Sequence, residues 1–335
     1  MTRAALTLTI AVALTAAATA SSVRIIQTNS AGTTVHLIDP ATNKVVGVIN
    51  GIEVNHGATS APDGSRLYIT NEADRTLDVV DARTLKVVKK IELTAHPNNV
   101  SISKDGRRVY VAIAAAPGAV DVINTTTLTR AKSIPVNGAA HNTYVTPDGK
   151  YILCGSVAGK LLTVIDQKTE TPAWTLAFDA GVRPIAFDQK PDGSTSRLFI
   201  QLSDFNGFAV VDFDRRKEVA RVKLPDVAER ERVTQGLQGS PSHGIGVTPD
   251  RRTLWVLSKM NSRVYEYSLP DLTLIGDAPT GHHPDWLTFS PDSKSVYIAN
   301  AGSNSVSVVD VASRRVVTEI PVGHVPKRNV TAILQ

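Results

Sequence analysis

Short runs of apolar and β-branched residues, separated by clusters of Asp, Gly, Asn and Pro, recur along almost the whole chain. In one stretch the runs cover residues 56–60, 66–71, 76–81 and 86–92, with turn residues such as Pro62-Asp63-Gly64 between them. Runs bounded in this way indicate β-strands. No window of comparable strength has the period of a helix. The pattern therefore predicts an all-β protein with four short strands in each repeat.

The repeats can be counted from a polar position that lies six residues before a Pro-Asp type turn. Six copies have a recognisable turn and a seventh lacks it; successive copies are 42, 43, 42, 60, 42 and 43 residues apart. Four strands at such a period are typical of a propeller blade. The single long gap indicates an insertion at about 225–241. The position is occupied in turn by His56, Asn98, His141, Arg183, His243, Asp285 and Arg328.

The two ends of the chain complete this count. The N-terminal part supplies three predicted strands, at 23–27, 34–39 and 44–49, and the C-terminus supplies one, at 329–334. We expect the last strand to complete the first blade as its innermost member, because closure of the ring removes exposed strand edges. The sequence predicts a seven-bladed β-propeller of four-stranded antiparallel blades, forming one domain over residues 21–335.

Residues 1–20 differ from the repeats that follow. They contain one early basic residue, Arg3, then an Ala-, Leu- and Thr-rich stretch that ends in Ala18-Thr19-Ala20. This composition is typical of a secretory signal peptide. The stretch is too weakly apolar for a transmembrane anchor. We therefore expect a mature, soluble protein that begins near Ser21, has no membrane span after cleavage, and is periplasmic or secreted.

Composition excludes some classes of function. The formal net charge is +5, but it is the balance of 36 basic and 31 acidic residues, and aromatic residues are 5% of the chain. Nucleic-acid binding is not indicated, since no stripe of basic and aromatic residues emerges. The single cysteine, Cys154, excludes an intrachain disulfide and is expected to be a small buried hydrophobe. We expect a monomer.

Two repeats carry a family resemblance. The segments 67–71 (LYITN) and 296–300 (VYIAN) follow Pro-Asp turns and lead to LDVVD at 77–81 and VSVVD at 306–310. They resemble the repeat of YVTN-type β-propeller proteins. The resemblance covers almost all of residues 21–335 and implies the propeller fold. Proteins with this repeat include exported binding proteins, surface-layer proteins, lactonase-like and virginiamycin B lyase-like enzymes, and haem d1 propellers, so the resemblance leaves the function open.

Acidic residues at the ends of the third strands have a structural explanation. A short acceptor side chain at this place can bond the backbone of the turn that follows, so no catalytic role is needed to explain them. The residues are Asp39, Asp81, Asn124, Asp166, Asp212 and Asp310.

The polar position used for the count is different, because its residue varies from blade to blade. It opens each innermost strand, so all seven side chains should converge near the axis and form a ligand-binding mouth. Three of them, His56, His141 and His243, come from alternating blades and are candidate ligands for a divalent transition metal. Asp285 is a candidate fourth ligand or general base, and Arg183 and Arg328 are candidates to hold a carboxylate or phosphate. Asp285 and Arg183 are thus the candidate catalytic residues.

Three functions follow from this arrangement. The first is the binding of a small molecule or a partner protein at the axial mouth. The second is a metal-dependent lyase or lactone hydrolase, in which a metal on His56, His141 and His243 polarises a carbonyl or activates water. The third is a protein-interaction scaffold with an inert channel. The propeller fold by itself does not choose among them.

Overall fold

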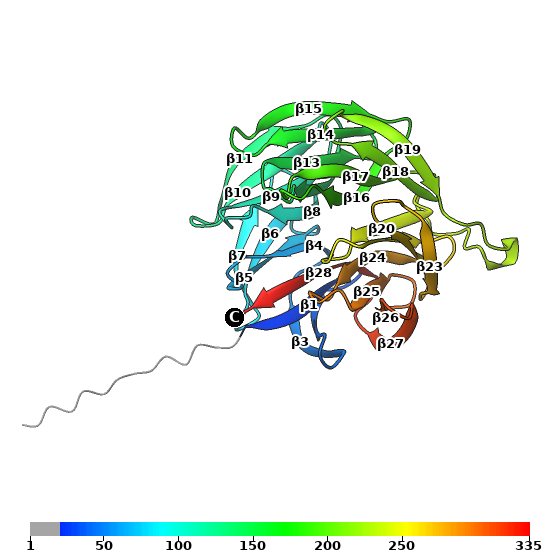
Figure 1. The fold of residues 1–335 in the computed structure, drawn as a ribbon. Helices are drawn as coiled ribbons and strands as arrows, with labels where there is room; N and C mark the ends of the chain where they lie inside the picture. Colours follow the sequence, from blue (N-terminus) through cyan, green and yellow to red (C-terminus); the bar gives the residue numbers. More distant parts are fainter. Residues whose placement is uncertain (1–20) are drawn as a thin grey trace, which may run out of the picture.

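The computed structural model describes residues 21–335, and the signal peptide predicted for residues 1–20 lies outside them. Within this range, seven four-stranded antiparallel sheets form a ring of blades (Figure 1). Blade 1 is completed by the C-terminal strand, and the other six blades follow one another along the chain. The predicted fold is therefore confirmed.

Blades 1 to 3 contain the first eleven strands together with the last one. Their bounds are β28 (Pro326–Leu334), β1 (Ser22–Asn29), β2 (Thr34–Asp39) and β3 (Lys44–Asn50) in blade 1, β4 (Asn55–Ser60), β5 (Arg66–Asn71), β6 (Thr76–Asp81) and β7 (Lys86–Glu92) in blade 2, and β8 (Pro97–Ile102), β9 (Arg108–Ile113), β10 (Ala119–Asn124) and β11 (Thr129–Pro135) in blade 3.

Blades 4 to 7 contain the remaining strands. Their bounds are β12 (Ala140–Val145), β13 (Tyr151–Ser156), β14 (Leu161–Asp166) and β15 (Thr171–Ala177) in blade 4, β16 (Val182–Gln189), β17 (Thr195–Leu202), β18 (Gly207–Asp212) and β19 (Lys217–Lys223) in blade 5, β20 (Ser242–Val247), β21 (Thr253–Ser258), β22 (Arg263–Ser268) and β23 (Leu274–Pro279) in blade 6, and β24 (Pro284–Phe289), β25 (Ser295–Asn300), β26 (Ser305–Asp310) and β27 (Arg315–Pro321) in blade 7.

The core is divided among the interfaces between neighbouring blades. Side chains alternate along a strand, so Ile25 of β1 packs against blade 7 while Ile26 packs against blade 2. Both faces of a blade are thus covered, which explains why the middle strands are buried along almost their whole length. The outer strands pair on one side only and are mostly exposed, as in β7, where only Ile91 is buried.

Strand β28 closes the ring. It pairs antiparallel with β1 from Ser22 opposite Leu334 to Asn29 opposite Pro326, and the two strands lie side by side in Figure 1. Its Ala332 and Leu334 belong to the apolar cluster between blades 1 and 2. The strand begins three residues earlier than the predicted 329–334, so Arg328 lies within it.

The turn residues behave as the sequence indicates. Asp81 accepts a hydrogen bond from the backbone of Thr84 at 2.8 Å, and the other aspartates at the same place accept equivalent bonds. Cys154 is free and buried, and burial raises its pKa to about 12. These acidic residues and this thiol therefore belong to the framework.

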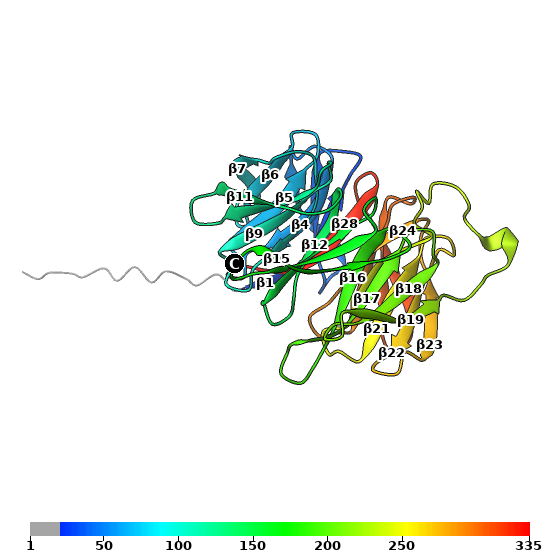
Figure 2. The same cartoon turned by 90° about the horizontal axis from the view of Figure 1, so that it is seen from above.

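The segment between β19 and β20 contains a single 3-10 turn, η1 (Glu229–Glu231). Figure 2 shows the loop extending from one side of the ring before it returns to β20. Its returning part contacts the ring through the backbone, since the amide of Val233 donates to the carbonyl of Met260 at 2.8 Å.

Candidate functional site

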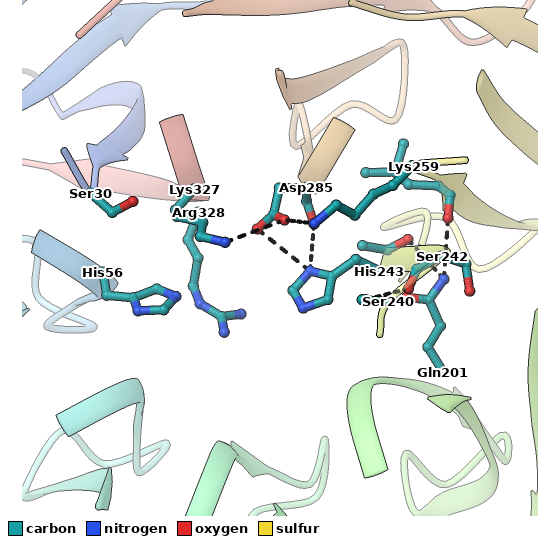
Figure 3. Close-up of polar contacts among 12 residues, drawn as sticks. Ser30, His56, Gln201, Ser240, Ser242, His243, Lys259, Asp285, Lys327 and Arg328 are labelled. Atoms are coloured by element: carbon teal, nitrogen blue, oxygen red, sulfur yellow. Dashed lines mark hydrogen bonds and ion pairs between the residues drawn. The ribbon is translucent and has the colours of Figure 1, made fainter. Parts of the chain in front are cut away.

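All seven residues of the variable polar position lie near the start of an innermost strand. Six are the second residue of their strand, and Arg328 is the third residue of β28. The structure brings most of them into contact with one another or with shared partners around the axis (Figure 3). We call this group the axial ring; it consists of His56, Asn98, His141, Arg183, His243, Asp285 and Arg328.

Arg328 occupies the middle of the ring. One of its terminal nitrogens, NH2, donates to the amide oxygens of Asn98 at 3.0 Å and of Asn142 at 2.9 Å, so its side chain reaches from blade 1 to blades 3 and 4. The guanidinium carbon lies 4.1 Å from the ring centroid of Trp286, within the range of a cation–π contact. Arg328 is 3% exposed, and among residues 21–335 its Nε and Nη1 atoms have no hydrogen-bond partner.

Asp285 lies between two lysines. Its Oδ1 is 3.1 Å from the ammonium of Lys259 and 3.6 Å from that of Lys327, and Figure 3 shows the two lysines on either side of the carboxylate. Burial by itself would raise the pKa of Asp285, but the charge of Lys327, assisted by that of Lys259, holds this pKa well below its usual value. Asp285 is therefore ionised and paired, which does not suit a free general base.

The side chain of His56 is paired with the carboxylate of Glu72. Its Nδ1 is hydrogen-bonded to Oε1 of Glu72, while Nε2 of His96 lies 3.3 Å from the other oxygen of that carboxylate. Burial lowers the pKa of His56 to about 4, although Glu72 opposes the shift. A neutral His56 that donates from Nδ1 keeps Nε2 as a hydrogen-bond acceptor.

His141 and His243 are neighbours across the channel. Their ring centroids are 6.1 Å apart, with the rings at 89°. His243 donates from Nδ1 to the backbone carbonyl of Asp285 at 2.8 Å, whereas Nδ1 of His141 is buried without a partner. Burial lowers the pKa of both rings well below its usual value, and the nearby charge of Arg328 lowers it further.

The three histidines are not gathered into a metal site. Across residues 21–335, no group of three or more His, Cys, Asp or Glu side chains is placed to hold a metal ion. Figure 3 shows the Arg328 guanidinium between His56 and His243. A fixed cation at that place repels a second cation, so the metal predicted on His56, His141 and His243 gains no support from the geometry.

Arg183 connects the ring to the insertion. Its Nε donates to the hydroxyl of Ser203 at 2.8 Å, and its NH2 donates to the backbone carbonyl of Gln238 at 3.0 Å. The amide of Asp204 donates to the carbonyl of Gly239 at 3.0 Å beside them. The end of the insertion therefore lies against the axial ring, with the guanidinium of Arg183 at the contact.

Three residues at the site were not predicted from the sequence: Glu72, Lys259 and Ser203. Each is the residue directly after the second strand of its blade, a position occupied around the ring by Ser30, Glu72, Ala114, Val157, Ser203, Lys259 and Ala301. Three of these contact the axial ring through their side chains. A sequence signal for them exists, because the residue at this second position differs from blade to blade while the strand before it follows the repeat.

Matching family models place the chain among known propellers. The model described as "Lactonase, 7-bladed beta-propeller" matches residues 117–320. This is more than half of the chain, so the protein belongs to this family of seven-bladed propellers. The model of the cytochrome D1 heme domain matches residues 22–150. Together the two matches cover the ring almost completely.

Solved structures agree on the fold. The chain is similar to hydrazine synthase from Kuenenia stuttgartiensis, with 22% identity, a TM-score of 0.75, and coverage of 86% of this chain and 92% of that one. It is also similar to a periplasmic gluconolactonase from Pseudomonas aeruginosa, with 19% identity, a TM-score of 0.73, and coverage of 94% and 100%. A third similar structure is that of dihydro-heme d1 dehydrogenase, with 16% identity, a TM-score of 0.66, and coverage of 89% of this chain and 63% of that one. At these identities the likeness concerns the fold alone.

Within residues 21–335, no helix has the length and apolar character that a membrane crossing requires.

Proposed function

We propose that this protein binds a small anionic ligand at the axis of the propeller, at the guanidinium of Arg328. The observation that carries the proposal is that this cation is 3% exposed while its Nε and Nη1 have no partner among residues 21–335. Its contacts with Asn98 and Asn142 are to neutral groups. A carboxylate or phosphate would supply both the missing charge and the missing acceptors.

Neighbouring charges favour the same ligand class. The two carboxylates near the axis are engaged elsewhere, Glu72 by His56 and Asp285 by Lys259 and Lys327. Since burial keeps the three ring histidines neutral, they do not compete as cations and can offer or accept hydrogen bonds. An ionised group removed from water without a counter-charge costs several kcal/mol, about the amount that a bound anion would offset.

Calorimetric titration tests this proposal directly. We expect gluconate, citrate or inorganic phosphate to bind the wild-type protein and the neutral polyol sorbitol not to bind. Arg328→Met should weaken the binding of the anion about 10- to 100-fold, the range for a lost charged hydrogen bond. Arg107→Met is the matched control, because the side chain of Arg107 is 80% exposed. Equal affinity in the two variants, or no anion bound by the wild type, would reject the proposal.

Hydrolysis of a lactone is a second candidate function. It is favoured by the family match over residues 117–320 and by the hydrogen bond between His56 and Glu72. In this reaction Nε2 of His56 takes a proton from water as the hydroxide attacks the lactone carbonyl, and the ring C–O bond then breaks while the imidazolium returns the proton to the departing alkoxide. The product is a hydroxy acid, whose carboxylate is the kind of group that Arg328 is proposed to bind.

The hydrolysis is tested by measuring acid release from glucono-1,5-lactone and γ-butyrolactone. We expect turnover above the uncatalysed rate that falls about 100-fold or more in His56→Gln, since a positioned base contributes roughly that factor. Metal analysis of the protein before and after chelation separates this mechanism from the metal-dependent lyase or hydrolase. Activity that His56→Gln leaves unchanged, or that chelation abolishes, contradicts the metal-free mechanism.

The proposed place of action is outside the cytoplasm. Support comes from the composition of residues 1–20, and one protein of similar fold is described as periplasmic. We expect cell fractionation to recover a protein whose N-terminus is Ser21. Recovery of the full-length chain from the cytoplasm alone would argue against export.

A further inference from the structure

A second chamber lies further along the axial channel, beyond Arg328 as seen from the ring histidines. It is formed by the later residues of the innermost strands and consists of two cavities, of about 290 and 400 Å³, that both contact Tyr144. Trp286 and Arg328 line the first cavity, whereas none of the three ring histidines lines either one. We call this space the far chamber.

The walls of the far chamber are mostly apolar. Val145 and Val330 line the first cavity, and Ile185 and Phe187 line the second. The rings of Tyr144 and Phe187 meet edge to face, with centroids 6.1 Å apart. Concave sites with apolar and aromatic walls and a few polar groups are typical of small-molecule binding.

The inner end of the chamber is polar and unsatisfied. Arg328 presents Nε and Nη1 without partners among residues 21–335, and the hydroxyl of Ser101, which also lines the first cavity, is buried without a partner as well. Buried polar atoms are normally paired. An unpaired cation that lines a mostly apolar space indicates a ligand with an anionic head and an apolar body.

We propose that the far chamber binds an apolar monocarboxylate, with its carboxylate on Arg328 and its hydrocarbon or aromatic body against Tyr144, Phe187 and Trp286. This inference rests on the proposed function in one respect, because both use the guanidinium of Arg328. It adds the direction from which the ligand enters and the chemical class of its body. Hydrophilic acids gain nothing from the apolar wall, so the chamber selects for acids with apolar bodies.

The test compares three probes by isothermal titration calorimetry on the purified protein. 3-Phenylpropanoate has the predicted head and body, 3-phenylpropanamide lacks the charge, and gluconate lacks the apolar body. We expect 3-phenylpropanoate to bind at least about tenfold more tightly than either of the others. In Arg328→Met the acid should bind no better than the amide.

A matched pair of variants locates the binding. Phe187 and Phe178 are both partly buried against the same core cluster, but Phe187 alone of the two lines the far chamber. Phe187→Leu should weaken 3-phenylpropanoate binding about fivefold and leave gluconate binding unchanged, whereas Phe178→Leu should change neither. If Phe187→Leu fails to fold, Ser101→Leu, which narrows the inner end, should weaken 3-phenylpropanoate binding in the same way.

The outcomes separate the two proposals. If gluconate binds and depends on Arg328, but 3-phenylpropanoate binds no better or is unaffected by Phe187→Leu and Ser101→Leu, the far chamber holds only solvent and this inference is overturned. If no carboxylate binds, the proposed function fails as well. Tight binding of 3-phenylpropanoate that depends on Arg328 and Phe187 supports both.

Discussion

Arg328 and the histidines around it illustrate how a buried fixed charge determines the state of its neighbours. His56, His141 and His243 are all buried near this guanidinium, so burial and its charge both lower their pKa. The consequence is a set of neutral imidazoles beside a permanent cation. This combination suits the proposed anion site, because the imidazoles do not change charge near neutral pH.

The same pKa shifts predict how stability depends on pH. A histidine whose pKa is lower in the folded than in the unfolded protein stabilises the fold fully above its unfolded pKa, here 6.5. This stability is lost as the pH falls below 6.5, at up to about 1.4 kcal/mol per pH unit for each histidine. Denaturant unfolding at several pH values should show this slope. In His141→Gln the slope should be smaller by up to about 1.4 kcal/mol per pH unit, the contribution of one bound proton. An unchanged slope would contradict a lowered pKa for His141.

The lysines beside Asp285 lead to a second prediction. Lys259 is 3% exposed and lies 3.1 Å from the carboxylate, whereas the side chain of Lys327 is 21% exposed and 3.6 Å away. Breaking a buried pair leaves an uncompensated charge, so Lys259→Met should cost about 3 kcal/mol of unfolding free energy. Lys327→Met, the matched control, should cost less than about 1 kcal/mol. Equal costs, measured by urea unfolding, would contradict this ranking.

At the scale of the strand and the blade, the positions of the repeat that build the fold differ from those that face the axis. Each third strand ends in an acceptor that bonds the following turn, and the middle strands are buried on both faces, as in β6. Two positions per blade belong neither to these turns nor to the middle strands: the start of the innermost strand and the residue directly after the second strand. They bring Arg328, Asp285, Lys259 and Glu72 to the axis.

Turns within the blades also impose local constraints that can be measured. Gly118 has φ +100, and a Cβ built on it would lie 2.0 Å from the carbonyl oxygen of Gly138. Gly193 also has a positive φ, +84, but nothing lies within 4 Å of its Cβ position. Gly193→Ala should therefore cost about 1 kcal/mol from the backbone conformation alone. Gly118→Ala should cost at least about 2 kcal/mol more, because the backbone must shift; similar melting temperatures for the two variants would refute this.

At the scale of the whole molecule, one strand holds the ring closed. β28 pairs with β1, contributes Leu334 to the core between blades 1 and 2, and carries Arg328. Closure of the ring and the proposed ligand binding therefore involve the same nine-residue strand. Without it, β1 would become an exposed edge inside the channel.

Truncation tests the importance of closure. We expect a chain that ends at Gly323 to lose the cooperative thermal transition seen by circular dichroism, since it lacks both the β1 pairing and part of a blade interface. Removal of Gln335 alone is the control, and it should leave the melting temperature within about 2 °C, as is usual at a chain end. A truncated chain that melts like the control would show that six complete blades suffice.

The sequence by itself determined the fold and the identity of the axial ring. Period, strand length and turn chemistry are local properties, and they repeat often enough that the seven blades and the position of His56, Asn98 and their equivalents can be counted directly. The closing strand followed from the same count. Its start at Pro326 did not, because strand ends depend on pairing with β1.

Only the tertiary structure decided which ring residues meet and in what charge state. Arg328 reaches Asn98 and Asn142, which are 230 and 186 residues away in the chain. Asp285, a candidate base in the sequence, is paired with Lys259, and the guanidinium between the histidines removes support for a shared metal. Distances across a ring arise from closure of all seven blades at once, and burial sets the pKa values, so no local pattern encodes either one.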